Sequence, residues 1–187
     1  MKRLDQYIQS LNFKAQIGQD RAVLDILGVK YDGTFVDIGC SLPISISNTF
    51  IFEATFNWRG LGVDIIDLIE GEGQTWKSHR PQTTHIVHDA LTLNYSKIFK
   101  ENNMPQTIDY LSLDLEPPDL TLECLYKIPF HEYVFNAITF ETDEYREDGQ
   151  RRTQESRKYL QGLGYNLIGC INRQDDLYVH SSYVKPL

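Results

Sequence analysis

The sequence predicts an α/β fold with an open, mostly parallel sheet and an antiparallel hairpin at one edge. Two observations predict it: short apolar, β-branched runs alternate with helical segments along most of the chain, and the last two runs follow each other without a helix between them. Parallel neighbours need a long crossover, so these last two strands are expected to pair antiparallel. The 187 residues, 41% of them hydrophobic, suffice for one domain with its own core, with residues 1–15 as an N-terminal extension.

Most of the predicted strands are short apolar runs that stop at a glycine, a proline or an acid. The first run contains Phe35, Val36 and Ile38 and ends at Gly39, as a buried strand should. The strands are expected at 34–39, 60–65, 83–88, 108–115, 133–141, 165–170 and 177–180.

The segments between these strands have helical character. Gly28 is a natural stop for the first of them, and the proline pair after the fourth strand can open the helix that follows. Gly71 and Gly73 interrupt the polar segment after the second strand, which is still expected to be helical. Helices are expected at 16–28, 49–58, 67–79, 95–101, 119–127 and 150–163.

Charge and cysteine content restrict the function classes. The chain has 18 basic and 26 acidic residues, a net charge of -8, which argues against a nucleic-acid partner because phosphate binding needs clustered lysines and arginines. No apolar run approaches the length of a membrane span, and the first residues lack the apolar core of a signal peptide. The three cysteines show no CxxC pairing, which fits free thiols in a reducing compartment. We therefore expect a cytoplasmic protein.

The turn after the first predicted strand has the composition of a ligand site. Gly39 lets the backbone turn tightly and approach a ligand, and Ser47 or Asn48 can cap a helix that begins at Thr49. Open α/β sheets build nucleotide-sized sites from such a strand, turn and helix at the carboxyl ends of their strands. Taken alone, the pattern fits an ordinary βα turn equally well.

An acid lies at or just after the end of each of five successive predicted strands: Asp37, Asp64, Asp89, Asp114 and Glu141. The carboxyl ends of parallel strands meet at one edge of the sheet, so these acids are expected to converge. Asp64 is placed to accept hydrogen bonds from ribose hydroxyls, and Asp89 from an adenine amino group. The chain lacks both GxGxxG and a P-loop, and a carboxylate-rich edge suits a positively charged ligand such as a sulfonium. S-adenosylmethionine is therefore favoured over NAD or ATP.

The motifs and their order resemble the FkbM-type methyltransferases, S-adenosylmethionine-dependent enzymes that methylate hydroxyls of natural products and glycans. The resemblance covers nearly all of the chain after residue 15 and implies a Rossmann-like class I methyltransferase sandwich. Two segments depart from the family pattern: DLEP at 114–117 replaces Asp-x-Glu-Gly, and CSLP at 40–43 replaces a glycine-rich turn. The matching segments are QIGQD at 16–20, FVDIG at 35–39, SNT at 47–49 with Glu53, WRG at 58–60, IDYLSLDLE at 108–116, AITFE at 137–141, GY at 164–165 and DDLYV at 175–179.

The resemblance also implies a set of cofactor-binding residues. It places Asp64 at the ribose of the cofactor. It places Asn48, with Gln19 as a further candidate, at the amino-acid end of the cofactor. Gln19 could equally be part of a helix cap, and Glu53 could form a buried pair with Arg59. The full set expected on S-adenosylmethionine is Asp37, Gly39, Cys40, Asn48, Asp64, Asp89 and Ala90.

Methyl transfer to an alkyl hydroxyl needs a base or a metal to remove or acidify the hydroxyl proton. The catalytic candidates are Asp114, Glu116 and Glu141, at the ends of adjacent strands. The same three carboxylates could hold Mg²⁺ or Mn²⁺, or one of them could act as a metal-free base. Asp143 is a further candidate, although a solvated loop explains it as well. Tyr145 and Arg146, which lie just beyond the fifth predicted strand, could contact an acceptor sugar.

The sequence thus predicts an O-methyltransferase (EC 2.1.1 class) that acts on a hydroxyl of a sugar, a glycan or a related small molecule. One alternative is an inactive methyltransferase-fold module that binds the cofactor or a glycan-assembly partner. Another is a dinucleotide-dependent oxidoreductase, against which the missing glycine fingerprint argues.

Overall fold

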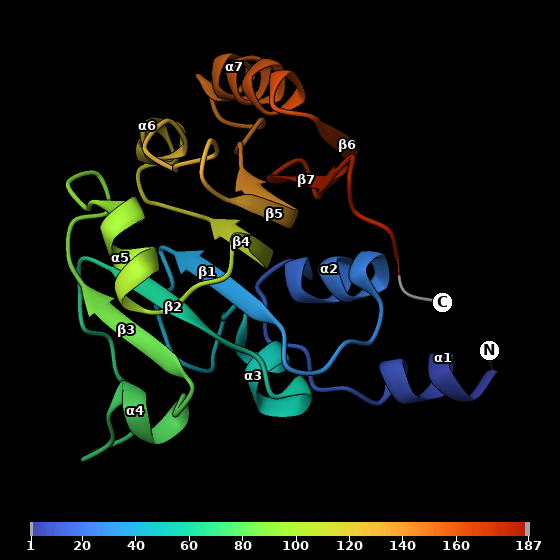
Figure 1. Ribbon diagram of the computed structural model, residues 1–187, viewed down its shortest axis with the longest axis vertical. Helices are drawn as coiled ribbons and strands as arrows, with labels where there is room; N and C mark the ends of the chain where they lie inside the picture. Colours follow the sequence, from blue (N-terminus) through green and yellow to red (C-terminus); the bar gives the residue numbers. More distant parts are fainter. Residues whose placement is uncertain (1, 186–187) are drawn as a thin grey trace.

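The computed structural model describes residues 2–185, which form a seven-stranded sheet between two layers of helices (Figure 1). The strand order is β3-β2-β1-β4-β5-β7-β6. Strands β1 to β5 pair in parallel, and β7 pairs antiparallel with both β5 and β6. The predicted fold class is therefore confirmed, with the last strand of the hairpin inserted between β5 and β6.

The strands lie within a few residues of their predicted positions. All of β1 is buried, as are β4 and β5 after their first residues, because helices cover both faces of the central sheet. The edge strands β3 and β6 are partly exposed. The strands are β1 Thr34–Ile38, β2 Arg59–Asp64, β3 Thr83–Val87, β4 Thr107–Leu113, β5 Val134–Glu141, β6 Tyr165–Ile171 and β7 Asp175–His180.

The helices also match the prediction, with one exception. The helix expected at 67–79 is reduced to four residues, Trp76–His79, because Gly71 and Gly73 adopt φ angles of 86° and 70° that a right-handed helix cannot contain. Thr75 caps this short helix by accepting a hydrogen bond from the Ser78 amide at 3.2 Å. The helices are α1 Lys2–Gln9, α2 Gln19–Leu27, α3 Phe50–Phe56, α4 Trp76–His79, α5 Tyr95–Glu101, α6 Asp119–Leu125 and α7 Gly149–Gly162.

Two apolar clusters join the helices to opposite faces of the sheet (Figure 1). On one face, α1, α2 and α3 contribute residues such as Leu24 and Phe52 to a cluster that includes Trp58. On the other face, α5, α6 and α7 bury residues such as Phe99 and Leu160 against β4 and β5. The sheet is thus covered on both faces, and the ends of its central strands remain open for a site. In the described part of the chain, no helix has the length and apolar character that crossing a membrane requires.

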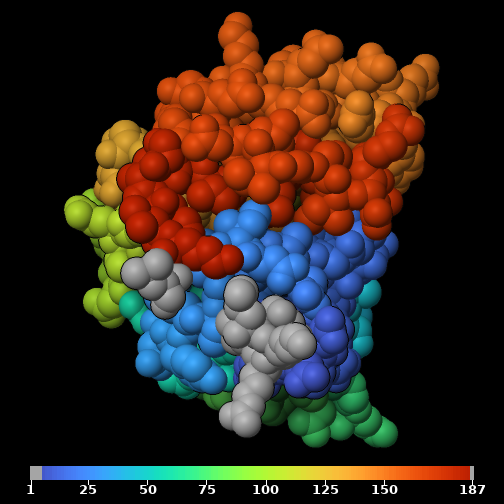
Figure 2. Space-filling view, turned by 90° about the vertical axis from the view of Figure 1, so that its right-hand side faces the viewer, coloured from blue at the N-terminus to red at the C-terminus, as the bar shows by residue number. Residues whose placement is uncertain are grey.

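The first and last parts of the chain lie side by side (Figure 2). The Gln19 amide on α2 donates to Asp175 on β7 at 3.0 Å, and the Tyr183 hydroxyl donates to the Leu27 carbonyl at 2.8 Å. Asp20, in the first turn of α2, accepts hydrogen bonds from the backbone amides of Lys14 and Ala15, at 2.7 and 3.0 Å. The segment expected as an extension is therefore anchored to the sheet by α2.

Candidate active site

A cavity of about 470 Å³ lies at the carboxyl ends of the parallel strands. All ten residues that the sequence assigns to cofactor binding, catalysis or metal binding line it. They are Asp37, Gly39, Cys40, Asn48, Asp64, Asp89, Ala90, Asp114, Glu116 and Glu141. The fold thus brings the predicted set together, and the role of each residue stays a prediction. Gln19 does not line the cavity, since its amide is directed to Asp175, whereas Gln16 of the same motif does.

The turn after β1 is packed so closely that only glycine fits at its start. A Cβ atom on Gly39 would lie 1.7 Å from the carbonyl oxygen of Asp114, and the residue has a φ of 84°. The amides of Gly39 and Cys40 both donate to the Val63 carbonyl, at 2.8 and 3.1 Å, which ties the turn to β2. Ser41 follows with a φ of 51°, so a non-glycine residue completes the turn without the expected glycine-rich motif.

One side of the cavity combines carboxylates with apolar side chains. Asp64 accepts hydrogen bonds from the amides of Ser41 and Ile66, at 2.9 and 3.1 Å, which leaves lone pairs on both oxygens for a ligand. Ile65 and Ile66 are 67% and 56% exposed and line the cavity beside Asp64. Asp89 accepts from the Leu91 amide at 2.9 Å. This side can offer hydrogen-bond acceptors to sugar hydroxyls and an apolar surface to a flat ring.

On the other side of the cavity, Asp114 and Glu141 differ in their pKa. Burial and the nearby charge of Asp37 raise the pKa of Asp114 to about 6. Burial and the charges of Asp114 and Asp143 raise the pKa of Glu141 to about 9. At neutral pH, Glu141 therefore holds a proton while Asp114 is mostly a carboxylate. Of these two acids, Asp114 is the one that can accept a proton.

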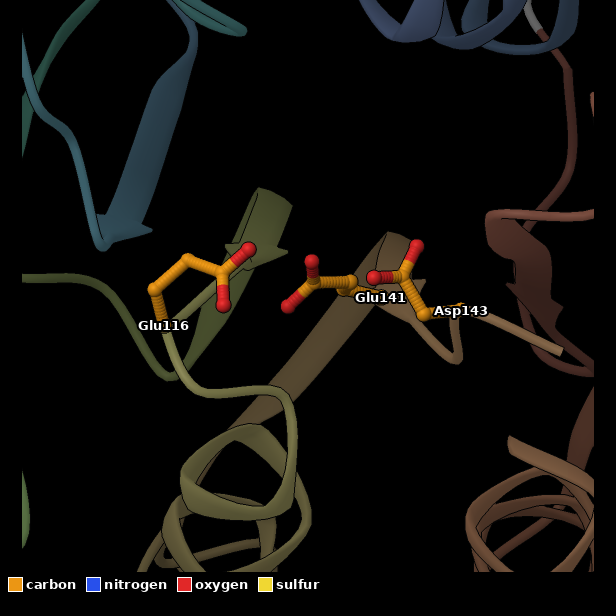
Figure 3. Close-up of side chains that lie close together, drawn as sticks. All are labelled: Glu116, Glu141 and Asp143. Atoms are coloured by element: carbon orange, nitrogen blue, oxygen red, sulfur yellow. The ribbon is translucent and has the colours of Figure 1, made fainter. Parts of the chain in front are cut away.

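Three carboxylates form a close group next to the cavity (Figure 3). Oxygen atoms of Glu116, Glu141 and Asp143 lie within 4.8 Å of one another, and Glu116 points towards Glu141 from the loop after β4. The group contains Asp143 in place of Asp114, which the sequence predicts there. Asp143 is only 3% exposed, so the solvated loop considered for it is wrong. The chain folds back there because the Asp143 amide donates to the Gln174 carbonyl at 2.9 Å.

Arg146 already provides a positive charge at this group. Its guanidinium lies 2.8 Å from Glu116 and 2.5 Å from Asp143. One guanidinium thus shares its single positive charge between two of the three carboxylates, and a divalent cation would have to displace this arginine. Tyr145 next to it is 53% exposed at the cavity wall.

Arg80 is a buried cation behind the site that the sequence analysis did not identify. It is 1% exposed and pairs with Glu53 at 2.7 Å. The pair considered between Glu53 and Arg59 is therefore wrong, because Arg59 is exposed and donates to the carbonyls of Asn102 and Asn103 instead. No local pattern marks Arg80, which lies in a polar segment before a proline and 27 residues away from Glu53.

The comparisons with known proteins identify the fold. The sequence matches no family model and no curated protein. A putative rRNA methylase from Clostridium thermocellum superimposes with a TM-score of 0.54 at 18% identity, over 90% of this chain and 97% of that chain. Human methyltransferase 10 domain containing protein superimposes with a TM-score of 0.57 at 10% identity, over 92% of this chain and 86% of that chain. Fibrillarin from Aeropyrum pernix was solved with natively bound S-adenosyl-L-methionine. It superimposes with a TM-score of 0.53 at 12% identity, over 86% of this chain and 75% of that chain. The chain has a methyltransferase fold.

This methyltransferase fold explains why the cavity lies where it does. The strand order runs outward in opposite directions from β1 and β4, so the connections after these two strands leave towards opposite faces of the sheet. A crevice forms at such a switch point, outside the carboxyl ends of the strands. Asp37 and Gly39, at the end of β1, and Asp114, just after β4, lie on the two sides of this switch point.

Proposed function

We propose that this chain is an S-adenosylmethionine-dependent O-methyltransferase of the FkbM type, with a hydroxyl of a sugar, a glycan or a related small molecule as acceptor. The observation that carries the proposal is the convergence of strand-end carboxylates on one cavity in a methyltransferase fold. The natively bound S-adenosyl-L-methionine of Aeropyrum pernix fibrillarin, which shares this fold, supports the cofactor. Three unpaired cysteines support the cytoplasm as its compartment.

The residues of the cavity fit this cofactor. Asp64 has free lone pairs for ribose hydroxyls, and Ile65 and Ile66 offer an apolar surface to the adenine ring. The carboxylate of Asp37, at the end of β1, suits the positive charges of the methionine part. When bound, the cofactor supplies an electrophilic methyl group on a sulfonium.

The remaining task of the protein is to orient the acceptor and take its proton. Alignment of the acceptor oxygen with the methyl group lowers the barrier by removing the entropy cost of encounter. Asp114 is the base that we propose, because it is half-buried at the cavity wall and still ionised at neutral pH. Glu141 holds its proton and can donate a hydrogen bond to the acceptor.

A divalent cation is the rival to this simple base. The carboxylates that would hold Mg²⁺ or Mn²⁺ are Glu116, Glu141 and Asp143, and a bound ion would acidify the acceptor hydroxyl. Arg146 occupies two of these three carboxylates, and Glu141 would have to lose a proton to bind the ion. Both observations favour the metal-free base.

The charge of the cavity favours an uncharged acceptor. Among the described residues that line it, seven are acidic, namely Asp37, Asp64, Asp89, Asp114, Glu116, Glu141 and Asp143, and one is basic, Arg146. The ion pairs with Glu116 and Asp143 already use this guanidinium. Two solved structures of this fold are described as a putative rRNA methylase and a putative ribosomal RNA methyltransferase. An RNA backbone would meet repulsion here, since phosphate binding needs free lysines and arginines.

Calorimetric titration with S-adenosylhomocysteine tests the cofactor site. We expect micromolar affinity, roughly -8 kcal/mol, that is lost in Asp64→Ala. Asp25→Ala is the matched control, because Asp25 is exposed on α2 and outside the cavity. A wild-type chain that binds no S-adenosylhomocysteine, with or without Mn²⁺, would refute the proposal. Binding without turnover of any hydroxyl acceptor would instead support an inactive module, the alternative that the departures at 40–43 and 114–117 favour.

A further inference from the structure

The buried guanidinium of Arg80 is directed at the loop that forms the cofactor side of the cavity. Arg80 does not line the cavity. Besides its pair with Glu53, it donates to the Pro43 carbonyl at 3.1 Å, to the Ser47 hydroxyl at 3.2 Å and to the Thr49 hydroxyl at 3.1 Å. A charge this deeply buried is tolerated only when it is paired and hydrogen-bonded. Here three of the acceptors lie between β1 and α3.

Thr49 occupies a helix N-cap position but does not cap the helix. Its side chain makes no capping hydrogen bond to α3, and Ser47 accepts from the Phe50 amide at 3.1 Å instead. The Thr49 hydroxyl donates to Asp37 at 2.7 Å. Threonine is favoured at an N-cap because its oxygen satisfies a free amide there. The diversion of this hydroxyl to a strand-end acid indicates a role other than helix stability.

Two hydrogen bonds link Arg80 through the Thr49 hydroxyl to Asp37, and the direction of each is fixed. A hydroxyl has one proton, so Thr49 can accept from the guanidinium only with a lone pair and must direct its proton elsewhere. The proton points to the carboxylate of Asp37, which is 2% exposed and lines the cavity. Burial raises the pKa of Asp37, and the hydrogen bond from Thr49 and the charge of Arg80 oppose this rise.

We infer that Arg80 and Thr49 are positioning residues for Asp37. Arg80 fixes the Thr49 hydroxyl, and the hydroxyl holds the Asp37 carboxylate as an oriented anion at the cavity wall. This inference rests on the proposed function in one respect: the partner of the anion is the α-ammonium of the methionine part of S-adenosylmethionine, a charge that S-adenosylhomocysteine also has. Removal of the hydroxyl is therefore expected to weaken cofactor binding, although neither Thr49 nor Arg80 lines the cavity.

The test uses Thr49→Val, with Thr49→Ser as its matched control. Valine has nearly the shape of threonine and leaves the pair of Arg80 with Glu53 intact, whereas Arg80→Met would leave a buried carboxylate unpaired and could prevent folding. We expect Thr49→Val to weaken S-adenosylhomocysteine binding about tenfold, the effect of losing a hydrogen bond to a charged group, and Thr49→Ser to restore it. Wild-type affinity in Thr49→Val would overturn the inference. Equal losses in both variants would also overturn it, since packing would then be the cause.

The dependence of this loss on pH separates ionisation from packing. The groups that face Asp37 are Arg80, Thr49, Ser112, Asp64, Cys40, Tyr110 and Asp114. Without the Thr49 hydroxyl, Asp37 keeps its proton to higher pH, so the loss of affinity should be largest at low pH and shrink as the pH rises. A loss that is constant with pH would contradict the inference.

A second measurement needs no cofactor and remains valid if the proposed function fails. The ¹³C carboxyl signal of Asp37, assigned with Asp37→Asn, can be titrated in protein labelled at aspartate. We expect its midpoint to rise in Thr49→Val and to stay at the wild-type value in Thr49→Ser. An unchanged midpoint in Thr49→Val would overturn the inference, whatever the wild-type chain binds.

Discussion

At the residue scale, the same environment gives two neighbouring acids different chemistry. Glu141 is buried and Asp114 is half-buried, and the charges of other carboxylates act on each of them. The pKa of Asp114 rises to about 6 and that of Glu141 to about 9, so only Asp114 changes its protonation in the mildly acidic range. A general base works best when its pKa lies near the pH of the reaction. This difference favours Asp114 over Glu141 as the base.

Asp114→Asn should therefore reduce turnover far more than cofactor binding. Loss of a general base costs about 10²- to 10⁴-fold in rate. In the wild type, kcat should rise with pH through about 6 as Asp114 loses its proton, and this step should be absent from the residual activity of the variant. The measurement is the pH profile of kcat. The control is Asp148→Asn, an exposed acid outside the cavity. Asp114→Asn with wild-type turnover would exclude Asp114 as the base.

Residues whose role follows from a local pattern could be predicted from the sequence, and residues whose role depends on distant partners could not. Asp37 and Asp64 were found because strands that end in an acid are visible in a short stretch of sequence. Arg80 has its partners 27 to 37 residues away, in a segment without any periodic signal. The burial of Asp143 cannot be predicted from its local sequence, because it depends on the hydrogen bond to Gln174, on the turn before β7, which folds the loop inward.

At the element scale, the positions of strands were easier to predict than the structure of the segment after β2. A buried strand needs a continuous apolar run, which the sequence displays directly. The segment 67–75 is polar, and its helical pattern is overridden by the left-handed backbone of Gly71 and Gly73. The same backbone geometry at Gly39 serves a different purpose, because there the lack of a side chain allows β1 and the Asp114 carbonyl to come together.

Gly39→Ala should be much more harmful to stability than Gly73→Ala. Both glycines have positive φ angles, 84° and 70°, so both substitutions have the left-handed penalty of about 1–2 kcal/mol. A Cβ on Gly39 would also lie 1.7 Å from the Asp114 carbonyl, whereas a Cβ on Gly73 would meet nothing within 4 Å. Overpacking adds about 1–3 kcal/mol. Thermal denaturation of the two variants should thus differ by about 2–12 °C in Tm. Equal melting temperatures would contradict the tight packing of this turn.

At the scale of the whole molecule, the convergence of acids has a cost in stability. Strands β1, β4, β5 and β7 bring Asp37, Asp114, Glu141 and Asp175 to one end of the sheet. Burial and the charge of Asp114 raise the pKa of Asp175 to about 7, so this acid too resists ionisation. A fold optimised only for stability would not gather buried carboxylates, because each must be desolvated next to like charges. Such an arrangement is typical of a functional site.

The cost should appear as a loss of stability with rising pH. For a carboxyl whose pKa is higher in the folded state, the folded chain binds more protons than the unfolded chain, so stability falls as the pH rises. For Glu141 this window extends from the ordinary value of about 4.3 to about 9. Glutamine cannot ionise, so Glu141→Gln removes this contribution.

Glu141→Gln should therefore melt higher than the wild type at pH 8 and close to it at pH 4. A gain of ~1 kcal/mol corresponds to about 2–4 °C for a domain of this size. The control is Glu116→Gln, whose side chain is 64% exposed and whose ion pair with Arg146 lies at the surface, where such pairs add little. Urea or thermal denaturation at the two pH values measures the difference. If Glu141→Gln were less stable than the wild type at pH 8, Glu141 would be an ionised carboxylate in the folded protein, and the assignment of the base to Asp114 would have to be reversed.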